Sequence, residues 1–124
     1  MELLDDGTVL KSSFPDAEMK NHILDIAKEA SIYHRIGPRE RIVRILGHSR
    51  DGLILEYMKN GDLKTYIQAQ KSIPISLKLK WAYQIVQAVS LLHKNGILYC
   101  DIKPRNFLLD ATLISKLLIS QGLQ

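Results

Sequence analysis

Three residues near the end of the chain have the types and spacing that a phosphoryl-transfer loop needs. Asp101 is followed by Lys103, and Asn106 stands just before the apolar run 107–109. A carboxylate can accept the proton of an attacking hydroxyl, and a cation can offset the charge on a transferring phosphoryl group. An asparagine amide oxygen can ligate a divalent metal ion. Pro104 fixes its own φ and biases Lys103 toward an extended backbone, so we expect a stiff loop.

The same run has a simpler interpretation, a solvated turn ahead of a strand. It resembles, however, the catalytic loop of eukaryotic protein kinases, usually written H-R-D-L-K-P-x-N, with Tyr99 and Cys100 in place of His and Arg. The resemblance implies that Asp101 is the catalytic base and Lys103 the phosphate stabiliser. It also implies ATP as phosphoryl donor, Mg²⁺ as cofactor and Asn106 as a metal ligand.

A second resemblance lies near the start of the chain. The run Val9-Leu10-Lys11 is similar to the V-A-I-K strand of the family, whose Lys contacts the α- and β-phosphates. Glu29, on the helix expected to follow, is similar in placement to the Glu that pairs with that Lys. A lysine that closes a strand is usually solvated, and a charged helix residue is normally exposed. Because the catalytic loop occurs in the same chain, we expect Lys11 and Glu29 to pair.

The run 53–63 is similar to the segment that holds adenine in the family. The resemblance implies that Glu56 and Met58 offer backbone groups to the base, with Leu55 as the apolar residue behind it. Backbone hydrogen bonds suit this task because they leave the side chains free to pack. An edge strand running into a helix explains the apolar pattern equally well.

The first half of the chain must position Lys11 and Glu29. A turn signal at 5–7 separates the short apolar segments 3–4 and 8–10. Asp16 is a candidate cap for a helix over 17–35, which Gly37-Pro38 ends. Its expected apolar stripe consists of Ile23, Ile26, Ala27 and Ala30. Strand character follows at 41–47 and 53–58, on either side of a turn signal at 49–52.

The second half must position the catalytic loop. Asn60-Gly61-Asp62 opens a short helix through Leu63, Tyr66 and Ile67, and a longer helix follows Pro74 and stops at Asn95-Gly96. The expected buried stripe of the longer helix is Leu79, Ala82, Ile85, Val86, Val89 and Leu92. Strands are expected at 107–109 and 115–118. Strands with one helix, then helices, then a functional loop indicate an α+β fold.

The kinase resemblance implies a more specific α+β fold, a fragment of the protein-kinase-like fold. Residues 1–58 would be a small-lobe portion, a truncated antiparallel sheet with one helix. Residues 59–124 would be the first helices of the large lobe with the catalytic loop. The apolar residues of the long helix, including Val86, Leu91 and Leu92, would then have few partners. An exposed patch of that size implies a partner, self-association or aggregation.

Four departures from the family pattern bear on activity. No G-x-G-x-x-G precedes Lys11, so a flap of backbone N–H groups over the phosphates is not expected. Ile119 falls where the family has the metal-binding Asp, and an aliphatic side chain cannot coordinate Mg²⁺. Cys100 replaces the Arg that docks a phosphorylated activation segment. The chain stops at Gln124, where that segment is expected to begin.

The composition indicates the class of protein and the compartment in which we expect it. The 124 residues are 46% hydrophobic and 24% charged, as in an ordinary globular domain. A single cysteine excludes an internal disulfide and fits a reducing compartment. The start is acidic where a secretory signal is basic, and no apolar run approaches the ~20 residues of a membrane span. We therefore expect a cytoplasmic or nuclear protein that uses no membrane.

Three functions remain in competition at this point. The first is ATP-dependent phosphoryl transfer to Ser/Thr hydroxyls of a protein substrate, impaired by the departures above. The second is a catalytically dead kinase-like module that binds a protein partner. The third is a nucleic-acid-binding protein that uses the basic cluster Arg35, Arg39, Arg41, Arg44 and Arg50. We do not expect nucleic acid as a partner, because only 6% of the residues are aromatic.

Overall fold

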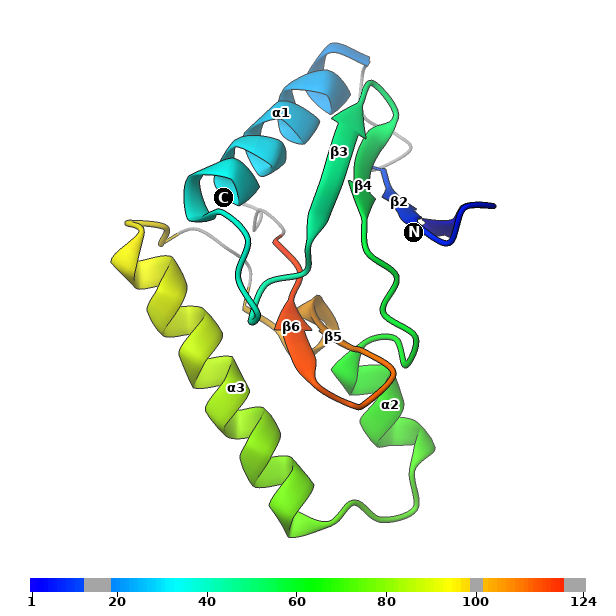
Figure 1. The fold of residues 1–124 in the computed structure, drawn as a ribbon, viewed down its shortest axis with the longest axis vertical. Coiled ribbons are helices and arrows are strands. Elements are labelled where there is room, and N and C mark those ends of the chain that lie inside the picture. The colour runs from blue at the N-terminus through cyan, green and yellow to red at the C-terminus, as the bar shows by residue number, and fades with distance from the viewer. Residues whose placement is uncertain (13–18, 99–101, 120–124) are drawn as a thin grey trace. The chain divides into compact units, whose positions relative to one another are not determined.

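A computed structural model describes residues 1–12, 19–98 and 102–119 (Figure 1). The chain divides into two compact units. The first unit consists of Met1–Pro38 and Arg44–Tyr57, and the second of Arg39–Val43 and Met58–Gln124. The α+β organisation is confirmed, because each unit combines helices with antiparallel strands. None of the described helices is long and apolar enough to cross a membrane.

The first unit is built on a four-stranded antiparallel sheet. Its strands are β1 (Glu2–Leu3), β2 (Val9–Lys11), β3 (Ile45–Ser49) and β4 (Gly52–Leu55), in the order β1-β2-β4-β3. The expected turn at 5–7 joins β1 to β2. Gly7 there has a φ of 86°, a left-handed value that glycine adopts without steric cost. The register pairs Lys11 with Leu53, which sets the position of the lysine.

Helix α1 (Met19–Ile36) belongs to the same unit. Over the residues 23–36, whose side chains the structure describes, its buried apolar residues are Ile26, Ala30, Tyr33 and Ile36. The expected stripe was therefore half wrong, because Ile23 and Ala27 are exposed. The buried face continues toward the C-terminal end, where Tyr33 and Ile36 supply much more apolar area than an alanine does. Gly37 ends the helix as expected, donating its N–H to the Tyr33 carbonyl at 2.9 Å. Asp16 lies outside the described residues.

The segment expected as one strand over 41–47 is divided in the structure. Strand β3 begins only at Ile45. Ile42 instead forms a parallel bridge with Leu117, and Leu117 exchanges backbone hydrogen bonds with Arg41 and Val43 at 2.8 and 2.9 Å. The pairing partner thus decides where the strand starts, and that partner is 75 residues away in sequence, at position 117 against position 42.

The second unit contains two helices that begin at the expected residues. Helix α2 (Leu63–Ala69) is capped by Asp62, whose carboxylate accepts hydrogen bonds from the N–H and hydroxyl of Thr65 at 2.9 and 2.8 Å. Helix α3 (Ile75–Lys94) follows Pro74 and ends at Asn95. Gly96 then takes a φ of 69°.

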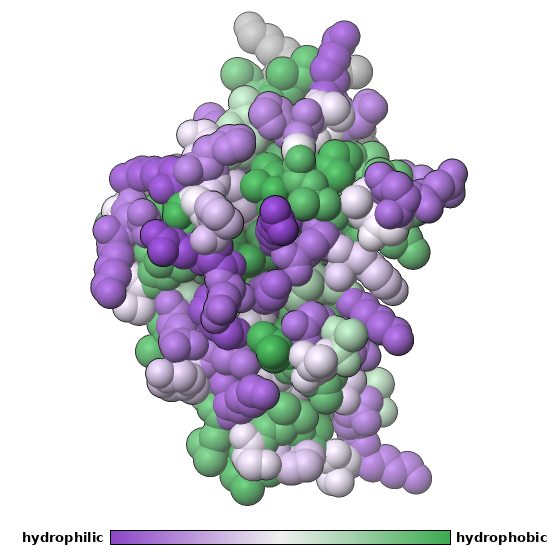
Figure 2. Space-filling view, viewed as in Figure 1, coloured by the Kyte–Doolittle hydropathy of each residue, from purple (hydrophilic) through white to green (hydrophobic). Residues whose placement is uncertain are grey.

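The buried face of α3 is not the expected one. Its buried residues are Trp81, Gln84, Ala88 and Leu92. Of the predicted stripe only Leu92 is buried, while Leu79 and Val86 are 63% and 65% exposed. The indole N–H of Trp81 donates to the Leu113 carbonyl at 2.9 Å, and this anchoring of the large ring fixes the helix rotation. The visible surface is mainly hydrophilic, with smaller hydrophobic patches between (Figure 2).

A short hairpin completes the second unit. The 3₁₀ turn Pro104–Asn106 leads into β5 (Phe107–Leu109), which pairs antiparallel with β6 (Ser115–Leu117). Phe107, Leu109 and Leu117 are fully buried. Both strands were expected, and β6 ends one residue earlier than predicted.

Candidate functional site

An ion pair in the first unit joins Lys11 to Glu29. The Lys11 Nζ donates to Glu29 Oε2 at 2.6 Å and to Oε1 at 2.9 Å. Both side chains are only 15% exposed, so water screens the pair weakly. An ammonium group has three donors, and the carboxylate uses two of them. The geometry therefore holds a cation at the end of β2 with a donor left for an anionic ligand.

Gly52 is a positioning residue that sequence reasoning treated only as part of a turn. A Cβ added to it would lie 2.2 Å from the Lys11 carbonyl oxygen and 2.8 Å from the Lys11 carbonyl carbon. Its φ of 152° is a value that side chains rarely allow. The start of β4 thus passes directly against the backbone of Lys11, and only glycine permits that approach. A glycine after Asp51 signals a turn, and nothing in sequence shows the contact.

The two residues expected to hold adenine fall in different units. Glu56 belongs to the first, where its N–H donates to the Arg44 carbonyl at 3.0 Å and its carboxylate accepts from the Arg44 N–H at 2.8 Å. Met58 belongs to the second, where its side chain is buried and its carbonyl accepts from Gly61 at 3.1 Å. Leu55 is buried, as expected for an apolar residue behind a base. The adenine role of Glu56 and Met58 stays a prediction.

Only part of the expected catalytic loop can be described. Asp101 lies outside the described residues, as do Tyr99 and Cys100. Lys103 precedes the 3₁₀ turn with φ −137° and ψ 153°, which is the extended backbone expected before Pro104. Its side chain is exposed. The assignment of Asp101 as base and Lys103 as phosphate stabiliser remains a prediction.

The hairpin places Asn106 beside the segment that carries Ile119. The Leu118 N–H donates to the Asn106 carbonyl at 2.7 Å, which extends the β5–β6 pairing by one residue. Asn106 is 9% exposed and Ile119 is completely buried. The two positions that would hold a metal in the family are thus neighbours, but one carries an aliphatic side chain.

The described residues do not fit a resident Mg²⁺. Mg²⁺ requires near-octahedral oxygen coordination and is usually held by one or two carboxylates. Ile119 offers no donor, and Asn106 offers one amide oxygen. Within the described ranges, no three His, Cys, Asp or Glu side chains lie close enough together to hold a metal ion. The metal-ligand role of Asn106 remains a prediction that this donor set does not support.

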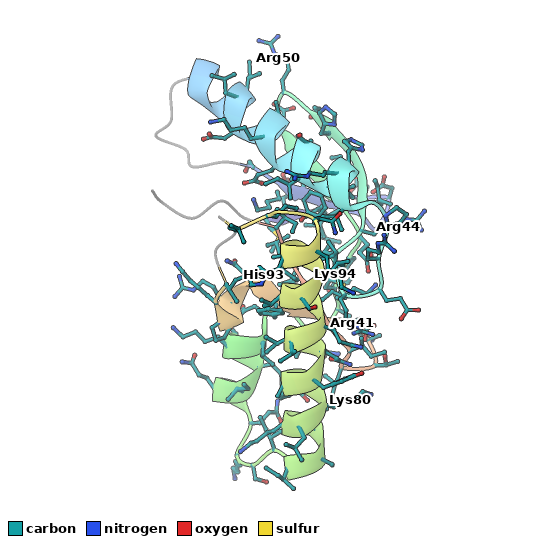
Figure 3. All side chains as sticks on the ribbon, turned by 90° about the vertical axis from the view of Figure 1, so that its left-hand side faces the viewer. Arg41, Arg44, Arg50, Lys80, His93 and Lys94 are labelled. Atoms are coloured by element: carbon teal, nitrogen blue, oxygen red, sulfur yellow. The ribbon has the colours of Figure 1, made fainter. Side chains whose placement is uncertain are left out.

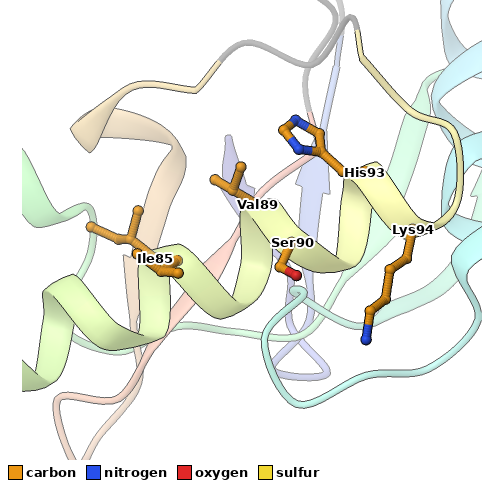
Figure 4. Close-up of a pocket in the computed structure, with 6 residues that line it drawn as sticks. Ile85, Val89, Ser90, His93 and Lys94 are labelled. Atoms are coloured by element: carbon orange, nitrogen blue, oxygen red, sulfur yellow. The ribbon is translucent and has the colours of Figure 1, made fainter.

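A hollow on α3 is apolar and lies along one helix. Its lining consists of Ile85, Val86, Val89, Ser90, His93 and Lys94 (Figure 4), and its volume is about 610 Å³. A wall drawn from a single helix cannot enclose a ligand. His93 is exposed at its edge. This is a surface feature, distinct in character from a substrate cleft.

The basic cluster is divided between the two compact units. Arg35, Arg44 and Arg50 lie in the first unit, while Arg39 and Arg41 lie in the second. Figure 3 labels Arg41 and Arg44, from the connection between α1 and β3, and Arg50, from the turn between β3 and β4. The Arg41 guanidinium donates to the Ser115 carbonyl at 3.2 Å, so it supports β6.

Comparison with known proteins agrees with this arrangement. Residues 6–118 match the model of the protein kinase domain family. The chain is 28% identical over 106 residues to human receptor-interacting serine/threonine-protein kinase 1, covering 82% of this chain and 16% of that protein. It is 33% identical over 106 residues to mitogen-activated protein kinase kinase kinase A of Dictyostelium discoideum, covering 82% and 11%.

A shorter match has a higher identity. It is 47% identical over 58 residues to the serine/threonine-protein kinase RUNKEL of Arabidopsis thaliana, covering 47% of this chain and 4% of that protein. The chain therefore spans only 4% to 16% of the length of these three relatives. The family model nevertheless matches most of the residues of this chain, from 6 to 118. The resemblance carried by Lys11, Glu29 and Asn106 agrees with that match. The chain belongs to the protein kinase domain family.

Proposed function

We propose that this chain forms a kinase-type nucleotide site laid out for phosphoryl transfer from ATP to Ser/Thr hydroxyls of a protein substrate, with the transfer step strongly impaired. The observation that carries the proposal is the Lys11–Glu29 ion pair at 2.6 Å. A part-buried ammonium held by one carboxylate is a phosphate anchor in this family. The names of two of the relatives, the human and the Arabidopsis proteins, describe them as serine/threonine-protein kinases, and these names support the substrate class.

The remaining roles follow from the family pattern. Asp101 would accept the proton of the substrate hydroxyl, and Lys103 would offset charge on the transferring group. The Met58 N–H would donate to adenine. Among the described residues no hydrogen-bond partner is found for that N–H, which supports its use by a ligand. Mg²⁺, where kinases bind it, neutralises the phosphate oxygens, and the donor set here does not fit it.

We expect the transfer step to be impaired because the groups that position the phosphates are incomplete. Phosphoryl transfer depends almost entirely on holding the phosphates in line with the attacking oxygen and stabilising their charge. With Ile119 in place of a carboxylate, one of the groups that performs both tasks is missing. We therefore expect nucleotide binding at about millimolar affinity, worth roughly 4 kcal/mol, and no measurable transfer.

Two assays on the full chain test this proposal. Thermal-shift titration with ATP should detect weak binding that Lys11→Met abolishes. The matched control Lys28→Met, an exposed lysine on α1, should leave binding unchanged. Radiolabel transfer to a generic protein substrate should stay at background. Transfer above background that disappears in Asp101→Asn would show that the chain is an active kinase.

A second candidate function is a catalytically dead module that binds protein through α3. Leu79, Tyr83 and Val86 on this helix are each more than 60% exposed, and burial of such side chains would be worth roughly 1.5–3 kcal/mol each. Light scattering at increasing concentration tests it. Self-association that Val86→Lys removes supports the candidate, and a monodisperse monomer that binds no hydrophobic dye contradicts it.

A further inference from the structure

We propose that His34 and His48 form a two-histidine site for a divalent transition metal ion of the Zn²⁺, Ni²⁺ and Cu²⁺ class. Both residues belong to the first unit, and the site is independent of the proposed nucleotide site. Their imidazole rings lie edge to face, with centroids 6.2 Å apart and an angle of 70° between the ring planes. Both side chains are exposed, so an ion can reach them from solvent.

The register of the sheet explains why the two histidines meet. Leu53 pairs with Lys11 on one side and with His48 on the other, so these residues form one row across β2, β4 and β3. Residues directly opposite one another point to the same face of a sheet. Lys11 contacts Glu29 of α1 at 2.6 Å, which identifies this face as the one that α1 covers. His48 therefore lies on the helix side of β3, and α1 lies beside that strand (Figure 1).

The last turn of α1 positions the other ring. Tyr33 and Ile36, on either side of His34, are each 3% exposed and anchor this turn in the unit. The Gly37 N–H closes the turn on the Tyr33 carbonyl at 2.9 Å. His34 thus stands on a packed turn and His48 on a paired strand. Binding of an ion would order two side chains and no backbone, which keeps its entropic cost low.

The distance between the rings fits a shared ion. A Zn–N bond is about 2.0–2.1 Å, and a ring nitrogen lies about an ångström from its centroid, so two imidazoles on one ion have centroids roughly 5–6.5 Å apart. The observed 6.2 Å falls in this range, and small rotations of the exposed side chains would aim one nitrogen of each ring at the ion. Imidazole nitrogen suits Zn²⁺, Ni²⁺ and Cu²⁺, whereas Mg²⁺ and Ca²⁺ prefer oxygen.

The remaining coordination positions would belong to water. Across the residues that the structure describes, no group of three His, Cys, Asp or Glu side chains could hold a metal ion. The ion would therefore be exchangeable, unlike the ion of a closed four-ligand structural site. Arg35 and Arg50 repel a cation, but both are exposed and salt screens them. The bound ion would join the C-terminal end of α1 to the edge strand β3.

The experiment titrates the full chain, without an affinity tag, with ZnCl₂, NiCl₂ and MgCl₂. Calorimetry measures the affinity and the stoichiometry, and thermal unfolding measures the linked stabilisation. We expect saturable binding of Zn²⁺ and Ni²⁺ in equimolar ratio to the chain. The unfolding midpoint should rise by at least about 4 °C when the ion is in about hundredfold excess over its dissociation constant. MgCl₂ at the same concentrations should give no such rise.

Substitutions locate the ion. His34→Ala and His48→Ala should each raise the dissociation constant at least about tenfold, the cost of losing even a group that only supports a ligand. His48→Phe keeps a ring for the edge contact but offers no nitrogen, so it should lose the ion and keep the stability measured in EDTA. The controls His22→Ala, His93→Ala and Cys100→Ser remove other candidate ligands from the chain and should leave the affinity unchanged. Circular dichroism in EDTA verifies that each variant is folded.

Three outcomes would overturn the proposal. The first is an absence of saturable Zn²⁺ or Ni²⁺ binding below about 1 mM. The second is binding that persists in both alanine variants, which would place the ion elsewhere in the chain. The third is binding that His48→Phe retains, which would leave the pair with a ring contact alone. Binding that is lost in these three variants and kept in the three controls would establish the site.

Discussion

The Lys11–Glu29 pair and the Asn106–Ile119 region invite comparison, because both correspond to functional positions of the kinase family pattern. The first has the complete family chemistry, an ammonium and a carboxylate 2.6 Å apart. The second has the family geometry, with neighbouring positions joined through the β5–β6 pairing, but one of its two side chains is aliphatic.

The difference shows that backbone geometry and side-chain chemistry can separate at a functional site. Ile119 is fully buried among apolar neighbours, so the fold accepts it at no cost in packing. Lys11 and Glu29 are constrained differently. Removing either one leaves the other as a part-buried charge without a partner, which is destabilising. The ion pair therefore bears on stability, whereas a carboxylate at position 119 is not required for packing.

The largest expected loss of stability comes from a substitution at Gly52, which lies against the backbone of Lys11. Gly52→Ala would place a Cβ 2.2 Å from the Lys11 carbonyl oxygen at a φ that alanine disfavours. We expect the free energy of unfolding to fall by about 2–4 kcal/mol. The control Gly47→Ala, with no atom within 4 Å of the added Cβ, should change it by less than about 1 kcal/mol. Urea unfolding measures both, and equal losses would contradict the role of Gly52.

Removing the hydrogen bonds that Gln84 makes to strand β6 should lower the free energy of unfolding somewhat less than Gly52→Ala does. The Gln84 side-chain oxygen accepts both the N–H and the hydroxyl of Ser115 at 2.9 Å, and both residues are buried. Gln84→Met leaves two polar groups unsatisfied, with an expected loss of about 2 kcal/mol in unfolding free energy. Trp81 fluorescence in urea measures the loss. The matched control Gln68→Met, at an exposed position of α2, should change stability by less than about 0.5 kcal/mol.

A double-mutant cycle sharpens the comparison at the ion pair itself. Lys11→Met and Glu29→Gln, singly and together, should give a coupling energy of about 1 kcal/mol, because the pair is part-buried. Thermal or urea unfolding supplies the four stabilities. A coupling energy near zero would mean that the pair stabilises nothing and that its value lies in ligand binding alone.

The smallest expected effect concerns Asp110, which closes the hairpin. Burial raises its pKa, but hydrogen bonds from the Ile114 N–H and from Thr112 outweigh this and hold the pKa below its ordinary 3.8. The unfolded chain then binds the proton at higher pH than the folded one. The stabilisation is complete above pH 3.8 and is lost as pH falls through the folded pKa.

We expect this loss to stay below about 1 kcal/mol, because water screens a side chain that is only partly buried. Urea midpoints measured between neutral pH and the acid limb test it. Asp110→Asn should lower stability at neutral pH and flatten that part of the acid limb. An unchanged acid limb in Asp110→Asn would show that other carboxylates account for it.

Much of the local structure followed from short-range signals. Helices α2 and α3 and the turn at 5–7 lie where cap, proline and glycine signals predicted them, and strands β5 and β6 lie where strands were expected. Helix faces were harder. On α3 the apolar residues Leu79 and Val86 are exposed while Gln84 is buried, because Gln84 finds two donors on Ser115. A sequence cannot show that a polar residue will be satisfied by a partner 31 positions away.

The sequence by itself determined the kinase resemblance, the order of the elements and the chemical misfit of Ile119, since these depend on residue type and spacing along the chain. The kinase resemblance also predicted that Lys11 pairs with Glu29, and the structure has this pair. Only the tertiary structure decided that Gly52 must lack a side chain and which face of α3 is buried. These depend on contacts between residues far apart in the chain. Their energies arise from distances and burial that exist only once the strands and helices have packed.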